Sequence, residues 1–188
     1  MSVAIPSLRK VQEIGSVLDD FTLPELNSGV QRSLAGALAG KRGVVVMFWS
    51  GVCSHCVRYD EYFNAFAEKH PEIALIVVAS RHGETPEMIN TAIAERGLKF
   101  SFVLDAGSAL ARGWYTQQTP RVFLMDADRR LLYRGAIDNF KYPVDPQYEA
   151  YLEPAIAALL AGKPVERTET ASFGCAIYSV YYILPKAL

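Results

Sequence analysis

The chain has 188 residues, of which 51% are hydrophobic and 21% are charged. This composition is typical of a folded α/β protein with its own core and excludes a disordered chain. Nineteen basic and twenty acidic residues give a formal net charge of −1, so no strong field favours nucleic acid or an anionic membrane. The apolar runs at residues 44–49 and 73–79 are far too short to span a membrane.

The N-terminal part is expected to form short elements before the first buried strand. Residues 1–15 form an arm with no clear periodicity, and residues 19–26 alternate polar and apolar side chains as an edge strand does. A turn at 27–29 and one helical turn at 34–38 follow. The apolar run 44–49 is the first buried strand.

The middle of the chain predicts an alternation of helices and strands. Aromatic residues at three- and four-residue spacing predict one helix over 53–69, ended by the His-Pro pair after it. Residues 73–79 are a β-rich run typical of a central parallel strand. A helix should begin near Pro86 and end before Gly97, and 100–104 forms a further strand.

The C-terminal part predicts a short helix, a hairpin and a last helix. Residues 108–114 suit the short helix, and 122–133 suit two strands about a polar turn. An amphipathic helix is expected over 147–161, with a start or a kink near Pro154. The apolar, tyrosine-rich tail 163–188 is expected to pack on the domain.

The most informative motif is Cys53-Ser54-His55-Cys56, which stands between the strand at 44–49 and the following helix. A helix N-terminus stabilises a thiolate through its free N–H groups and its dipole. Cys53 is therefore expected to attack, and Cys56, one turn further along, to close the disulfide. His55 is expected to stabilise the Cys53 thiolate and so to make the disulfide more oxidising.

The pattern around these cysteines resembles the thioredoxin-like superfamily, in the branch that contains TlpA and ResA-type proteins and the redoxin (AhpC/TSA) group. The resemblance rests on Phe48-Trp49-Ser50-Gly51-Val52-Cys53-Ser54-His55-Cys56, on Thr119-Pro120-Arg121-Val122-Phe123, and on Asp20-Phe21-Thr22-Leu23. It implies an α/β thioredoxin fold over residues 16–162, with a central mixed sheet flanked by helices and with N-terminal and central insertions.

The resemblance also implies roles for three residues outside the cysteine pair. Pro120 would be a cis-proline that faces the dithiol, and Thr119 would precede it in the loop that receives an extended substrate strand. Trp49 would cover the sulfur atoms, although an aromatic residue at the end of a strand can equally belong to the core.

The sequence departs from the family pattern at three points. Met47 replaces the acidic residue that thioredoxins carry six positions before the first cysteine, so Asp60, Glu61 or a water would have to accept the Cys56 proton. Tyr59 replaces the glutamate of ResA-like proteins three residues past the second cysteine. The Pro-x-x-x-Thr-x-x-Cys motif of peroxidatic relatives is absent, which weakens a peroxidase assignment.

The function predicted from the sequence is thiol–disulfide exchange at Cys53 and Cys56 with protein or small-thiol partners, without an organic cofactor or a metal ion. One alternative is a thiol peroxidase with Cys56 or Cys175 as the resolving thiol. Another is a non-enzymatic redox or zinc-binding module, in which zinc would need further ligands from Cys175, His70 or His82.

Two expectations concern the ends of the chain. Cys175, in Gly174-Cys175-Ala176-Ile177, has either a third redox role or an unreactive packing role, since its apolar neighbours would raise the pKa of its thiol. The first residues lack the pattern of a secretory signal, which predicts a cytoplasmic protein for the sequence as printed, with export as the alternative if the natural chain is longer.

Overall fold

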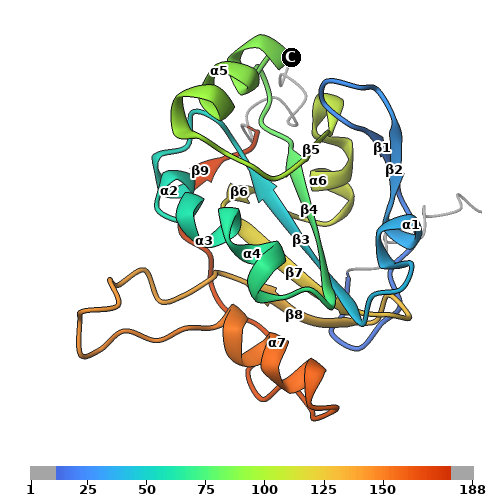
Figure 1. The fold of residues 1–188 in the computed structure, drawn as a ribbon, viewed down its shortest axis with the longest axis vertical. Helices are drawn as coiled ribbons and strands as arrows, with labels where there is room; N and C mark the ends of the chain where they lie inside the picture. Colours follow the sequence, from blue (N-terminus) through green and yellow to red (C-terminus); the bar gives the residue numbers. More distant parts are fainter. Residues whose placement is uncertain (1–11, 179–188) are drawn as a thin grey trace, which may run out of the picture.

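The structure is a computed structural model that describes residues 12–178. Its centre is a five-stranded sheet of order β5-β4-β3-β7-β8, in which β3 pairs in parallel with β4 and antiparallel with β7 (Figure 1). This is the mixed sheet of the thioredoxin fold that the resemblance implies. The strands are β3 (Gly43–Trp49), β4 (Ile73–Ala79), β5 (Phe102–Leu104), β7 (Arg121–Asp126) and β8 (Leu131–Gly135).

The sheet is buried on both faces because alternate residues of its strands point into two separate clusters. In β3, Val45, Met47 and Trp49 join one cluster, with residues of the helices α3 (Asp60–Asn64), α4 (Phe66–Lys69), α5 (Pro86–Arg96) and α7 (Leu152–Leu160). Val44 and Phe48 join the other cluster, with residues of α1 and α6. All seven residues of β3 are buried, so the strand that leads to Cys53 is held from both sides.

The helices lie on these two faces, and Figure 1 shows α2, α3 and α4 in front of the sheet, with α7 below it. No helix within residues 12–178 is long and apolar enough to cross a membrane. The helices are α1 (Leu34–Leu38), α2 (Ser54–Val57), α3 (Asp60–Asn64), α4 (Phe66–Lys69), α5 (Pro86–Arg96), α6 (Ala109–Gly113) and α7 (Leu152–Leu160), with a 3-10 turn η1 (Ala106–Ser108) before α6.

The single helix expected over 53–69 is wrong, because the segment forms three short helices, α2, α3 and α4. The N–H groups of Cys56 and Tyr59 bond to carbonyls three residues back, at 3.0 Å each, which winds the first turn more tightly than an α-helix. Tyr59 then leaves helical geometry, with φ of −108° and ψ of 7°, and Ala65, at φ of −90° and ψ of −4°, lies at the boundary between α3 and α4. The aromatic periodicity is nevertheless real, since Phe63 and Phe66 are buried in the same cluster.

Most of the other expected elements are confirmed. The helix expected between Pro86 and Gly97 is α5, and Gly97 ends it with a left-handed φ of 60°. The last helix begins at Leu152, so Pro154 lies in its first turn, where a missing N–H costs nothing. The segment expected as an edge strand at 19–26 is shorter, as β1 (Thr22–Pro24) pairs with β2 (Gln31–Ser33) in a separate two-stranded sheet.

The C-terminal segment runs back across the domain after α7. Glu169 bridges to Arg134 at the edge of β8, and β9 (Cys175–Ala176) pairs antiparallel with β6 (Gln118–Thr119). Ile177 is buried in the cluster on the α1 and α6 face. Residues 163–178 thus contact the sheet edge and the segment before Pro120, whereas the rest of the tail and residues 1–11 lie outside the described part.

One buried carboxylate organises the start of α6 and supports a stability prediction. Asp105 is buried and accepts hydrogen bonds from the Ser80 hydroxyl at 2.8 Å and from the N–H groups of Leu110 and Ala111 at 2.9 and 3.0 Å. Asp105→Ala leaves these buried donors without an acceptor and should lower the free energy of unfolding by about 3 kcal/mol. Urea unfolding followed by circular dichroism measures this change. The exposed Asp128→Ala should stay within about 0.5 kcal/mol of the parent, and an unchanged Asp105→Ala midpoint would contradict the assignment.

Candidate active site

The sulfur of Cys53 lies where the end of β3, the start of α2 and the loop before β7 meet. Cys53 is the N-cap residue of α2, and Cys56 lies in the first turn of that helix. The Thr119–Pro120 peptide bond is cis, as expected, and the Cys53 sulfur lies 3.2 Å from the Thr119 carbonyl oxygen, to which it donates a hydrogen bond only in its protonated form. The strand, the helix and the cis-proline loop thus converge on one sulfur atom.

Two charged side chains hold the loop between β3 and Cys53. The N–H of Val52 donates to Glu84 Oε1 at 3.0 Å, and Arg96 Nη1 donates to the Gly51 carbonyl at 3.2 Å. Arg96 also forms a two-pronged ion pair with Asp60 and lies over the Trp49 ring at 5.1 Å. Because both oxygens of Asp60 contact Arg96, this carboxylate braces the loop, which argues against the role expected for it as proton acceptor of Cys56.

The two thiols of the motif have opposite pKa shifts. The pKa of Cys53 is lowered to about 4, chiefly by a hydrogen bond from Cys56, with further donation from the Thr119 side chain. The pKa of Cys56 is raised well above its ordinary value, chiefly by burial and then by the neighbouring Cys53. At neutral pH the site therefore holds one thiolate, on Cys53, and one thiol, on Cys56.

The hydroxyl of Thr119 can donate a hydrogen bond to the negatively charged sulfur of Cys53. The Thr119 Oγ1 is buried and, apart from the Cys53 sulfur whose pKa it lowers, has no hydrogen-bond partner in the described part of the chain. A hydroxyl beside a sulfur can donate to it once the sulfur is ionised. A Cys53 thiolate therefore gives this buried hydroxyl an acceptor.

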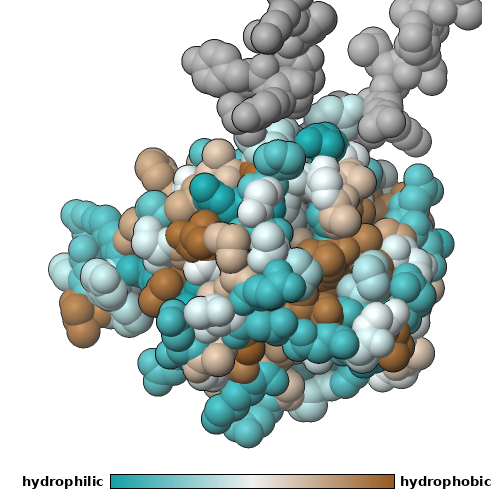
Figure 2. All heavy atoms as spheres, turned by 90° about the horizontal axis from the view of Figure 1, so that it is seen from above, coloured by the Kyte–Doolittle hydropathy of each residue, from teal (hydrophilic) through white to brown (hydrophobic). Residues whose placement is uncertain are grey.

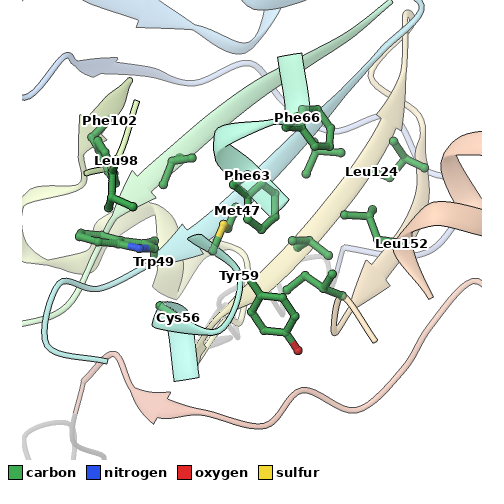
Figure 3. Close-up of a cluster of buried hydrophobic side chains, with 14 of the residues drawn as sticks. Met47, Trp49, Cys56, Tyr59, Phe63, Phe66, Leu98, Phe102, Leu124 and Leu152 are labelled. Carbon is green, nitrogen blue, oxygen red and sulfur yellow. The ribbon is translucent and has the colours of Figure 1, made fainter. Parts of the chain in front are cut away.

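Trp49 belongs to the same buried cluster as Cys53 and Cys56. Figure 3 shows it in this cluster together with Cys56. Trp49 is fully buried and packs against Phe102, with ring centroids 4.7 Å apart. Its surroundings therefore favour a role for Trp49 in the core over a role as a cover of the sulfur atoms. Met47, in place of an acidic residue, is also buried in this cluster.

His55 contacts the sulfur of Cys175 as well as lying close to Cys53. Its Nδ1 is 3.8 Å from the Cys175 Sγ, and its ring packs on Phe140 at 5.3 Å. The causes that lower the pKa of Cys53 are hydrogen bonds from Cys56, Thr119 and Cys175. A His55 ring nitrogen also lies within 4.8 Å of the Cys53 sulfur, so the action of His55 on the Cys53 thiolate stays a prediction, and the structure adds the contact with Cys175.

Cys175 is the residue for which the sequence allowed either a redox role or a packing role. It is paired with Thr119 across β6 and β9, and its Sγ, the Cys53 Sγ and a His55 ring nitrogen lie within 4.8 Å of one another. Burial raises the pKa of its thiol, as its apolar neighbours predicted. Among residues 12–178 this is the one group of three potential metal ligands, and it contains neither His70, which pairs with Glu153 at 3.0 Å, nor His82.

A cavity of about 180 Å³ opens beside Pro120. Its floor includes Tyr59 and Ile137, and its rim includes the exposed rings of Phe140 and Phe173. Phe140 belongs to the loop after β8, and Phe173 belongs to the segment before β9. The cavity is therefore an apolar hollow within reach of the cis-proline loop.

Asp138 fixes the base of the loop that forms this rim. It is buried, accepts hydrogen bonds from the Tyr59 hydroxyl at 2.7 Å and the Phe140 N–H at 2.8 Å, and pairs with Arg58. The Tyr59 hydroxyl points out of the aromatic cluster (Figure 3). A bridge between Asp138 and Ala150 closes the loop, which protrudes from the domain in Figure 1.

Comparison with known proteins agrees with this geometry. The profile of the Redoxin family matches residues 13–152. The chain belongs to the Redoxin family. It is 27% identical over 145 residues to the thiol-disulfide oxidoreductase ResA of Bacillus thuringiensis (strain Al Hakam), covering 77% of this chain and 80% of the relative. This likeness supports an oxidoreductase role.

Solved structures show how far the fold of this Redoxin protein extends. A hypothetical protein from Sinorhizobium meliloti 1021 is 28% identical with a TM-score of 0.77, and the match covers 89% of this chain and 96% of that one. A thioredoxin-like protein from Aeropyrum pernix is 23% identical with a TM-score of 0.52, and covers 61% and 80%. The second likeness identifies the shared fold alone.

Proposed function

We propose that this Redoxin protein is a thiol–disulfide oxidoreductase in which Cys53 is the attacking residue and Cys56 the resolving one. The observation that carries the proposal is the position of the Cys53 sulfur, at the N-cap of α2 and against the cis-proline loop, with Cys56 in the first turn of the helix. The hydrogen bond from Cys56 lowers the pKa of Cys53, and burial raises the pKa of Cys56. A thiolate is the nucleophile of disulfide exchange, and a protonated neighbour does not compete with it.

The reaction follows from this difference. The Cys53 thiolate attacks one sulfur of a partner disulfide, and the other partner sulfur leaves as a thiolate. Cys56 then loses its proton and attacks the Cys53 Sγ, which releases the second partner thiolate and leaves a Cys53–Cys56 disulfide. Run in reverse, the same steps transfer the disulfide to a partner dithiol.

We infer that partners present an apolar side chain beside the exchanging sulfur. The cavity next to Pro120 is mostly apolar, and Phe140 and Phe173 in its lining are exposed by 41% and 70%. Tyr142, in the same loop as Phe140, is exposed by 68%. Figure 2 shows hydrophobic groups among hydrophilic ones at the end of the protrusion. Exposed aromatic groups beside a hollow are typical of surfaces that bind other molecules.

The reduction potential of the Cys53–Cys56 pair tests the proposal. A stabilised thiolate favours the reduced form, so the potential should lie above the value of about −270 mV for thioredoxin and towards about −120 mV, the value of strongly oxidising disulfide-forming proteins. The protein is equilibrated in glutathione redox buffers and its free thiols are trapped, with a Cys175→Ser variant in parallel to isolate the pair. If Cys175→Ser shows no reversible two-electron couple, the proposal fails, and zinc content becomes the next measurement.

A further inference from the structure

Only one of the three cysteines has accessible surface. The residues Cys53 and Cys56 are 0% and 1% exposed, whereas Cys175 is half-buried. The cover over Cys53 includes the Thr119 carbonyl and the segment of β9 that contains Cys175. A thiol or disulfide from solution therefore meets Cys175 before it meets the attacking sulfur.

The backbone holds Cys175 at the position that a partner's cysteine would take. β9 pairs antiparallel with β6, with Cys175 opposite Thr119 and Ala176 opposite Gln118. This edge lies directly before Pro120, where an incoming extended strand would have to pair with the loop. The chain's own segment thus occupies the strand position and places a sulfur within 4.8 Å of the Cys53 sulfur.

Gly174 permits this close approach. A Cβ atom at Gly174 would lie 1.7 Å from the Thr119 carbonyl oxygen and 2.6 Å from its carbon. No side chain can be accommodated at such distances, so β9 can pair with β6 only with glycine here. The contact of Cys175 with the dithiol therefore depends on its neighbour in the sequence.

We propose that Cys175 is a third redox cysteine that forms a disulfide with Cys53 and exchanges with external thiols at its accessible sulfur. The proposal rests on the proposed function in one respect, because the Cys53–Cys56 disulfide supplies the bond that is transferred. The Cys175 thiolate attacks the Cys53 Sγ, the Cys53–Cys56 bond breaks, and the Cys56 thiolate takes up a proton. The number of disulfides is unchanged, and His55 Nδ1, 3.8 Å from the Cys175 sulfur, can accept the proton that Cys175 loses.

The next steps return the chain to its dithiol form. An external thiolate attacks the accessible Cys175 sulfur, and Cys53 leaves as a thiolate. A second external thiolate then releases the first as a disulfide and frees Cys175, so two external thiols are oxidised for one protein disulfide reduced. The direction of attack agrees with the low pKa of Cys53, since the sulfur of lower pKa leaves faster.

The test uses the full chain with Cys56→Ser and oxidised glutathione as the probe. The first exchange releases one reduced glutathione and leaves a mixed disulfide, and the second cysteine then displaces the other glutathione. We expect two glutathione thiols per chain, and a disulfide between the tryptic peptides 43–58 and 168–186 in a non-reducing mass spectrum. The double variant Cys56→Ser/Cys175→Ser should release at most one glutathione and show no linked peptide.

A pair of glycine variants tests the geometry while retaining every thiol except Cys56. Cys56→Ser/Gly174→Ala should lose most of the linked peptide, because a methyl group at this position displaces β9. Cys56→Ser/Gly113→Ala is the matched control, since a Cβ at Gly113 meets nothing within 4 Å. The inference is overturned if the Cys56→Ser protein stays in a mixed disulfide with one glutathione and no linked peptide is found. The proposed function fails separately, if Cys175→Ser lacks the reversible Cys53–Cys56 couple.

Discussion

Replacing Cys53 with serine should reduce catalysed disulfide exchange to the rate measured without protein, a loss of about a hundredfold or more, because a hydroxyl at neutral pH cannot replace a thiolate. The assay follows reduction of a disulfide-bonded peptide by dithiothreitol. Ser54→Ala, in the next residue, is the control, because Ser54 is exposed and the cover of the site is unchanged. Activity retained by Cys53→Ser would transfer the attacking role to Cys56 or Cys175.

The second large effect that we expect is that the Cys53 thiolate persists in mildly acidic solution. With a pKa of about 4 in the folded protein, Cys53 should be almost fully ionised at pH 6, whereas a thiol with the ordinary pKa of about 8.5 would be ionised to roughly 0.3%. This difference is about 300-fold. The ultraviolet absorbance of the thiolate, measured against pH with Cys53→Ser subtracted, gives the titration.

The same shift sets the sign of a stability change with pH. Between the folded pKa and the higher unfolded pKa, the unfolded chain holds a proton that folded Cys53 has lost, so the stability of the reduced protein rises with pH. This contribution is lost as the pH falls through about 4. Cys56→Ala removes the main hydrogen-bond donor and should move the thiolate titration to higher pH. A titration near pH 8.5 in the parent protein would contradict the site geometry.

The sequence predicts best those features that depend on local pattern. The apolar runs correspond to β3 and β4, and the proline and glycine that flank α5 mark its two ends. Cys56 and Thr119 are 63 residues apart in the sequence. Only the resemblance to the family predicted that the cysteine pair and the Thr119–Pro120 loop lie together, because no local sequence pattern places a loop against the start of a distant helix.

The features that the sequence could not predict depend on contacts between distant segments. The breaks at Tyr59 and Ala65 arise in a segment whose aromatic spacing fits a continuous helix, while the Tyr59 hydroxyl contacts Asp138 far along the chain. The pairing of Cys175 with Thr119 depends on two residues per strand, which is too short for a strand pattern. Glycine directly before Cys175 is the one local signal for it, because glycine allows a close backbone approach.

The fixed base of the loop at Asp138 separates partner selectivity from the exchange chemistry, two properties that could otherwise change together. Asp138 ties the loop to Arg58 and Tyr59, which directly follow α2, and its bridge to Ala150 closes the loop behind it. The residues at the tip of the loop, 143–146, can therefore vary in sequence and length without moving the sulfur atoms, whereas Phe140 has to stay because its ring packs on His55. Replacing this tip would thus be a route to new partner selectivity with the exchange chemistry unaltered.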